Sequence, residues 1–196
     1  MLDEKSLATF VDRHTLVYER VYPHDIDLVW EAVSTGEHLD VWMLPESRVD
    51  RRLGGECAFG WGGSADEPGA TTGTVAVFDP PRAIQYSFDD GWSYMRFDLE
   101  PADGGTRLSF TLHFAPAATA EAEPWPGGDL PAGSGTAWRP GFVAGYHEFL
   151  EDLTAYLRGE WTAEDRAAQL GGKEAERHER WIEIYRAHIR ETCPVA

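Results

Sequence analysis

Six short β-type segments followed by one long amphipathic helix pattern constrain this chain more than any other feature. The β-type segments are residues 47–53, 56–61, 71–79, 83–88, 92–100 and 105–114. Gly, Pro and Asp clusters separate them, which predicts hairpins and an antiparallel meander. Residues 140–158 carry the helix pattern. We expect the sheet to curl around this helix, because each element has an apolar face that needs cover.

The phase of the apolar residues predicts which side chains face the interior. In the last two strands, inward and outward residues alternate with a period of two. The inward set is Met95, Phe97, Leu99, Leu108, Phe110, Leu112 and Phe114. On the helix, the apolar face comprises Phe142, Tyr146, Phe149, Leu150, Leu153 and Leu157. Glu148, Glu151 and Asp152 are expected on its opposite, polar side.

The N-terminal part of the chain adds strands and two short helices. A β-branched and aromatic run predicts a strand at 15–22, with a shorter one at 8–11. Asp25 is a candidate N-cap for the first helix, and Thr35 for a second helix that ends before Pro45. The expected fold is therefore α+β, of the helix-grip type, with an antiparallel sheet curled around a long C-terminal helix.

The charge balance excludes several partner classes. The chain has 34 acidic and 17 basic residues, a formal net charge of −17. Nucleic acids and anionic membrane surfaces need clustered Lys and Arg, so we expect neither as a partner. No apolar run is long enough to span a bilayer, and residues 1–5 do not resemble a secretory signal. Cys57 and Cys193 suggest reduced thiols, and the predicted location is cytoplasmic.

Two motifs that superficially suggest chemistry fail on spacing. His147-Glu148-Phe149-Leu150-Glu151 lacks the second His of a zinc-protease helix, and His147 is expected on a partly exposed helix face. Gly60-Trp61-Gly62-Gly63 lacks the Gly-Lys-Ser/Thr of a phosphate-binding loop. We therefore expect no metal, no nucleotide and no other cofactor, and we assign no catalytic residue.

Aromatic residues form the candidate ligand-binding site. Strand phase and helix face direct eight of them toward one interior, which is either a solid core or an apolar pocket with a few polar groups. Tyr86, Tyr146 and His147 are candidates for those polar groups. The eight candidate residues are Trp42, Phe59, Trp61, Tyr86, Phe97, Phe110, Phe142 and Tyr146.

Three short motifs carry a family resemblance. They are Gly36-Glu37-His38-Leu39-Asp40-Val41-Trp42, Asp79-Pro80-Pro81-Arg82 and Gly145-Tyr146-His147. Around them the chain resembles the START-related (SRPBCC) cavity proteins, in the branch named after the activator of the heat-shock-protein-90 ATPase. The resemblance implies a START or birch-pollen-allergen-like fold with a cavity between sheet and helix. It also implies a bacterial protein of a subgroup with a C-terminal helical extension.

The resemblance leaves three functions open. The first is a non-catalytic binder of a small hydrophobic or aromatic molecule, the second a polyketide cyclase or dehydratase using the same cavity, and the third a chaperone-associated protein. An enzyme would need at least two buried polar residues that converge in the pocket. A pocket lined only by apolar side chains favours the binder.

The remaining segments complete the predicted organisation. Residues 1–158 form the helix-grip domain and 159–196 a helical extension. Thr162 and Asp165 have capping-box spacing, and a second helix is expected at 173–191. Its apolar stripe, Trp181, Ile182, Tyr185 and Ile189, is expected to dock on the domain or across a homodimer. The Gly- and Pro-rich segment 115–137 is predicted to be a mobile lid.

Overall fold

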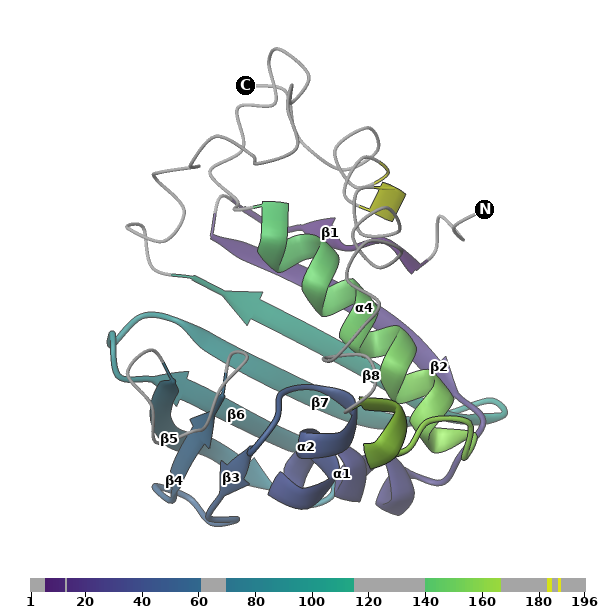
Figure 1. Cartoon of the computed structure of the whole chain (residues 1–196), viewed down its shortest axis with the longest axis horizontal. Coiled ribbons are helices and arrows are strands. Elements are labelled where there is room, and N and C mark those ends of the chain that lie inside the picture. Colours follow the sequence, from purple (N-terminus) through teal and green to yellow (C-terminus); the bar gives the residue numbers. More distant parts are fainter. Residues whose placement is uncertain are drawn as a thin grey trace.

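The described strands form a single antiparallel sheet. The computed structural model describes residues 6–12, 14–60, 70–114, 140–166, 183–184 and 187, apart from the side chains of residues 10 and 140–142. Its eight strands follow the order β1-β2-β8-β7-β6-β5-β4-β3 (Figure 1). The strands are β1 Thr9–Phe10, β2 Thr15–Tyr22, β3 Arg48–Val49, β4 Glu56–Phe59, β5 Thr71–Asp79, β6 Ala83–Phe88, β7 Tyr94–Ala102 and β8 Gly105–His113.

Three helices lie on one face of this sheet. They are α1 Ile26–Ser34, α2 Gly36–Trp42 and α4 Pro140–Leu157. Helix α4 runs across the sheet, and α1 and α2 lie beside it on the same face (Figure 1). This arrangement confirms the predicted helix-grip α+β fold. The apolar faces of the sheet and of α4 pack against each other, as the periodicity of their apolar residues predicted. Phe97, Phe110 and Leu153 are at most 1% exposed.

Close packing of strands explains one glycine in the sheet. Gly73 on β5 pairs with Phe88 on β6. A Cβ atom at position 73 would lie only 2.1 Å from the carbonyl oxygen of Ser87. A side chain therefore does not fit at this position without moving the backbone of the neighbouring strand.

The strand boundaries differ from the predicted ones where side chains hold the chain in turns. Strand β7 begins at Tyr94, two residues later than expected, because Asp90 Oδ1 accepts hydrogen bonds from the backbone N–H groups of Trp92 (2.8 Å) and Ser93 (2.7 Å). Such a turn diverts the backbone from ladder pairing. Strand β3 is limited to Arg48–Val49, much shorter than the predicted 47–53.

The predicted helix caps have the right positions but different chemistry. Asp25 and Thr35 occupy the N-cap positions of α1 and α2 with extended backbone, yet neither side chain makes a capping hydrogen bond. Thr35 Oγ1 instead donates to Glu31 Oε2 at 3.0 Å. Glu31 also accepts two hydrogen bonds from Arg51, at 2.8 and 2.7 Å, which tie α1 to the β3–β4 connection.

The segment after α4 begins as predicted. Thr162 and Asp165 form the expected reciprocal capping box, and residues 163–166 are helical. The predicted docking stripe at Trp181, Ile182, Tyr185 and Ile189 and the lid at 115–137 lie outside the described residues. The division into two units at residue 158 stays a prediction. In the part of the chain that is described, no helix is both long and apolar enough to cross a membrane.

Candidate functional site

A continuous layer of aromatic rings lies between the sheet and α4. Ring centroids are 5.3 Å apart for Phe59 and Tyr86, 6.3 Å for Tyr86 and Phe97, and 4.5 Å for Phe97 and Phe110. The layer continues from Phe110 to Tyr146 on α4 at 5.7 Å. The structure thus brings together six of the eight predicted site residues, which are Trp42, Phe59, Tyr86, Phe97, Phe110 and Tyr146. The other two, Trp61 and the side chain of Phe142, lie outside the described residues.

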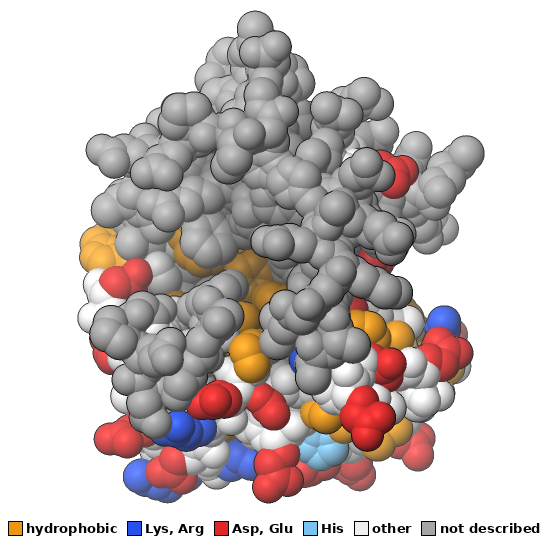
Figure 2. Space-filling view, in the orientation of Figure 1, with side chains coloured by type: hydrophobic (Ala, Val, Ile, Leu, Met, Phe, Trp, Pro, Cys, Tyr) orange, Lys and Arg blue, Asp and Glu red, His pale blue; other side chains and the backbone are white. Residues whose placement is uncertain are grey.

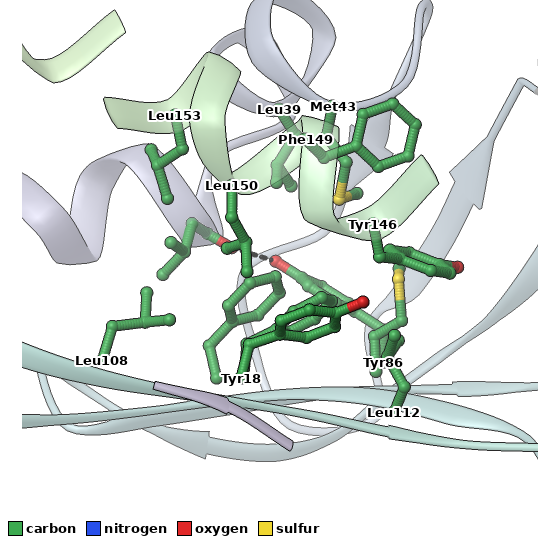
Figure 3. Close-up of a cluster of buried hydrophobic side chains, with 14 of the residues drawn as sticks. Tyr18, Leu39, Met43, Tyr86, Leu108, Leu112, Tyr146, Phe149, Leu150 and Leu153 are labelled. Carbon is green, nitrogen blue, oxygen red and sulfur yellow. Dashed lines mark hydrogen bonds between the residues drawn. The ribbon is translucent and has the colours of Figure 1, made fainter. Parts of the chain in front are cut away.

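At one end of the layer, the polar atoms of the aromatic residues are bonded to α1. Trp42 Nε1 donates to the carbonyl of Ala32 at 2.9 Å, and the Tyr86 hydroxyl donates to the carbonyl of Val33 at 2.9 Å, drawn as the dashed line in Figure 3. Burial raises the pKa of Tyr86 well above its usual value, so the phenol stays neutral and donates. These two residues therefore anchor α1 and α2 to the sheet.

The other end of the layer lies at the N-terminal half of α4. There Tyr146 contacts Phe110, Phe114 at 6.3 Å and Phe149 at 5.7 Å. Its hydroxyl points away from the labelled cluster (Figure 3). Burial raises the pKa of Tyr146, so its hydroxyl is neutral at physiological pH. Figure 2 shows the molecule from the same side as Figure 1, and hydrophobic side chains gather in the middle of the face that it presents.

His147 is fully buried, so the prediction of a partly exposed position is wrong. Its ring makes an edge-on contact with Tyr18 on β2, with centroids 6.2 Å apart, and its Nε2 lies 3.5 Å from Glu151 Oε1. The physical reason is the sheet order. Strand β2 pairs with β8 and extends the sheet beneath that side of α4. Glu148, expected on the polar side, is also buried, at 6% exposure.

Tyr18 also belongs to the aromatic layer, although it is not among the eight residues predicted for the site. Its hydroxyl donates to the carbonyl of Val143 at 2.5 Å, and its ring stacks on Phe110 with centroids 6.3 Å apart. Burial is the main cause that raises the pKa of Tyr18, with a smaller contribution from nearby Tyr146. Alternation along 15–22 places Tyr18 inward with Leu16, so the signal was present.

These contacts give the site a mixed lining. Tyr18, Tyr146 and His147 put polar atoms next to the rings of Phe110 and Phe149, all between β2, β8 and α4. Neutral phenols next to aromatic faces suit an apolar molecule with a hydrogen-bonding group.

A groove on the opposite face of the sheet has a different character. It has a volume of about 900 Å³, and its floor includes outward residues of β7 and β8, among them Arg96 and Arg107. Each of these arginines is paired with a carboxylate, Arg96 with Asp98 at 2.7 Å and Arg107 with Glu100 at 2.5 Å. The groove is polar and charge-compensated, unlike the predicted apolar site.

The described part of the chain contains no cluster of side chains that could bind a metal ion. No group of three or more His, Cys, Asp or Glu side chains is placed there to hold a metal ion. Cys57 is buried, and burial raises the pKa of its thiol to about 12. The expectation that no cofactor is needed remains a prediction.

A curled antiparallel sheet that grips a long helix over an aromatic interior defines the helix-grip class of proteins. The family model described as "Activator of Hsp90 ATPase homolog 1-like protein" matches residues 23–158. The chain belongs to this family. The comparison with curated proteins gives no match.

Solved structures share the fold at low sequence identity. The solution structure of CalU16 from Micromonospora echinospora has a TM-score of 0.61 and 18% identity, and the match covers 90% of this chain and 85% of that one. A Rhodobacter sphaeroides protein has a TM-score of 0.56, 18% identity and coverage of 78% and 97%. The Aha1 dimer from Colwellia psychrerythraea has a TM-score of 0.54, 14% identity and coverage of 74% and 97%.

Proposed function

We propose that this protein binds a small hydrophobic or aromatic molecule between the sheet and α4 without transforming it. The observation that carries the proposal is the mixture of aromatic rings and polar side chains at the N-terminal half of α4. There the ring of Tyr146 contacts three phenylalanines, and the ring of His147 lies against Tyr18. The Tyr18 hydroxyl is bonded to the carbonyl of Val143, as the polar atoms of Trp42 and Tyr86 are bonded to α1. A preformed apolar site with a few polar groups is the usual form of a small-molecule site.

The proposal assigns different roles to the predicted site residues. The proposed ligand contacts are Tyr146 and the three phenylalanines whose rings contact it, Phe110, Phe114 and Phe149. They lie where the Tyr146 hydroxyl points away from the labelled side chains of Figure 3. The remaining described members, Trp42, Phe59, Tyr86 and Phe97, form the floor of the site.

Binding of a neutral fluorescent probe tests the proposal directly. N-phenyl-1-naphthylamine should bind saturably with increased emission, and it should raise the melting temperature, because a ligand that binds only the folded state stabilises it. Phe114→Trp should narrow the site and weaken binding with little loss of stability. Phe97→Trp, the matched control in the floor, should instead lose about 1–3 kcal/mol of stability from overpacking. Probe binding that neither saturates nor responds to Phe114→Trp contradicts the proposal.

One observation favours an enzyme as the second candidate. His147 is completely buried, with Glu151 3.5 Å from its Nε2 and Tyr18 against its ring. A carboxylate beside an imidazole is an arrangement that supports proton transfer. The candidate reaction class is the cyclisation or dehydration of a polyketide-like substrate. Turnover of such a substrate that His147→Gln abolishes, with probe affinity unchanged, would favour the enzyme over the binder.

Location and assembly belong to the same proposal. We infer a cytoplasmic protein with no nucleic-acid or membrane partner, in line with its net charge of −17. A homodimer is supported by the description of the Colwellia psychrerythraea relative as a dimer. Light scattering during size-exclusion chromatography measures the mass, and a mass of about 21.9 kDa at all concentrations contradicts the dimer.

A further inference from the structure

The segment that follows α4 caps the C-terminal end of α2. We propose that residues 159–166, here called the strap, fix α2 against α4 and thereby set the width of the ligand site, with Trp161 and Arg166 as the positioning residues. The consequence for ligand size rests on the proposed function. The capping itself does not, and it is measurable without any ligand.

Helix α2 ends with backbone carbonyls that have no partner in the helix. The last carbonyls of any helix need partners from outside it. The carbonyl of Val41 accepts a hydrogen bond from Trp161 Nε1 at 3.0 Å. The carbonyl of Met43, the C-cap residue, accepts one from Arg166 Nη2. Two side chains of the strap therefore satisfy the end of α2.

Arg166 also reaches α4. Its Nη1 lies 3.3 Å from Asp152 Oδ2, and its guanidinium carbon lies 5.4 Å from the centre of the Phe149 ring. The side chain of Arg166 is 6% exposed and that of Asp152 is 14% exposed. A buried cation at a helix C-terminus is favourable because the carbonyl ends of the helix carry negative partial charge. Arg166 thus connects α2 and α4 at one buried point.

Local sequence signals direct the strap into this position. The backbone N–H groups of Gly159 and Glu160 donate to the carbonyls of Tyr156 and Ala155, both at 2.9 Å, which is the Schellman pattern that ends α4. Gly159 has a φ of 71°, which suits glycine at this position. The Thr162–Asp165 capping box then starts the next helical turn and places Arg166 over α2.

The position of α2 matters to the ligand site because Trp42, on α2, forms part of the floor of that site. Trp42 packs edge-on against Phe97, and Phe149, which lies under Arg166, contacts Tyr146. A second link between the helices, His38 Nδ1 to the Tyr156 hydroxyl at 2.5 Å, lies nearer the start of α2. Loss of the strap should therefore free the C-terminal end of α2, at Trp42, more than its start.

Amide hydrogen exchange of the full-length protein tests the strap without a ligand. Arg166→Met and Trp161→Phe should each speed exchange in α2 about tenfold, since each removes a hydrogen bond to a buried carbonyl, and should leave β7 and β8 unchanged. Arg158→Met is the matched control, because Arg158 is an exposed arginine eight positions earlier. If α2 exchanges equally fast in all variants, or if exchange in the sheet speeds up as much as in α2, the proposal that the strap caps α2 is overturned.

A second variant separates capping from charge pairing. Asp152→Asn removes the carboxylate partner of Arg166 and leaves its bond to Met43. If the bond to Met43 caps α2, Asp152→Asn should speed exchange in α2 less than Arg166→Met does, because it leaves a buried arginine without its carboxylate but keeps the cap. Asp152→Asn/Arg166→Met should exchange like Arg166→Met. If Asp152→Asn alone matches Arg166→Met, the bond to Met43 adds nothing to the ion pair, and the capping of α2 is overturned.

Two neutral probes of different length test the effect on the site. N-phenyl-1-naphthylamine should bind Arg166→Met less tightly than wild type, whereas the longer diphenylhexatriene should bind it equally or more tightly, so the ratio of affinities changes. An unchanged ratio together with faster α2 exchange overturns the role in specificity. Failure of both probes to bind the wild type overturns the proposed function, while the exchange experiment still decides whether the strap caps α2.

Discussion

Phe97 and Phe110 face each other across β7 and β8, with ring centroids 4.5 Å apart and planes inclined by 14°. They sit at the centre of the aromatic layer, where Phe97 also contacts Trp42 and Tyr86, and Phe110 also contacts Tyr18 and Tyr146. This pair therefore connects β2, the central strands, α2 and α4. Its packing should dominate the stability of the interior.

Removing one ring of this pair should be costly. Phe110→Ala is expected to lower the free energy of unfolding by about 3–5 kcal/mol, because it leaves a cavity among three other rings. Urea denaturation measures the change. Trp92→Ala is the control: Trp92 is 63% exposed, and its loss should change stability by no more than about 0.5 kcal/mol. Equal effects of the two substitutions would mean that Phe110 is not part of a packed layer.

The two buried tyrosines of the predicted site should respond differently to loss of the hydroxyl. Tyr86→Phe leaves the buried carbonyl of Val33 without its donor, so it should cost about 1–3 kcal/mol and leave probe affinity unchanged. Tyr146→Phe should weaken the binding of a ligand that carries a hydroxyl or carbonyl group. Parallel denaturation and titration experiments on both variants give the comparison. The reverse pattern would place the ligand contact at Tyr86.

Acid should remove the stabilisation that comes from Glu31. Hydrogen bonds from Arg51 are the main cause that holds the pKa of Glu31 below its usual value of 4.5 in the folded protein. Stabilisation is therefore complete above about pH 4.5 and is lost as the pH falls through the lower folded pKa. Because the Glu31 side chain is 46% exposed, the effect should be at most about 1 kcal/mol.

Glu31→Gln measures this contribution. The variant should be less stable than wild type at pH 7, and the difference should shrink toward zero as the pH falls below the folded pKa of Glu31. Glu56→Gln, at an exposed position on β4, is the control and should show no such convergence. A constant difference between Glu31→Gln and wild type across this range would show that the ion pair contributes nothing.

The thiol of Cys57 should not react with thiol reagents while the protein is folded. Its thiol is 3% exposed, and burial raises its pKa to about 12, so little thiolate forms at pH 8. In a Cys193→Ser background, Cys57 should react with dithionitrobenzoate only as fast as the structure opens, and at once in denaturant. Immediate reaction of the native protein would contradict its placement.

Much of the fold could be predicted because its signals are local. Strands β2, β5 and β6 coincide with the predicted segments 15–22, 71–79 and 83–88. In each case Gly, Pro or Asp marks the turn, and alternation marks the buried face. Helix α4 ends within a residue of its predicted end, because the apolar periodicity continues up to Leu157.

The site was harder to predict from the sequence, because the roles of its polar groups depend on partners that lie far away along the chain. The Tyr86 hydroxyl bonds to Val33, 53 positions earlier, and no local pattern reveals that this hydroxyl is already used. Likewise, the burial of His147 follows from the position of β2 beside β8, which the helix pattern alone does not contain. Sequence periodicity identified the rings of the site but not the roles of their polar atoms.

The short edge strands limit how copies of this chain associate. Both strands at the edges of the sheet, β1 and β3, are two residues long, so each offers a neighbouring chain only a brief run of free backbone. A second copy that paired with β1 or β3 alone would therefore form almost no ladder. A homodimer that met at β1 or β3 would therefore have to be held mainly by side-chain contacts, and these two strands offer little template for open-ended strand stacking.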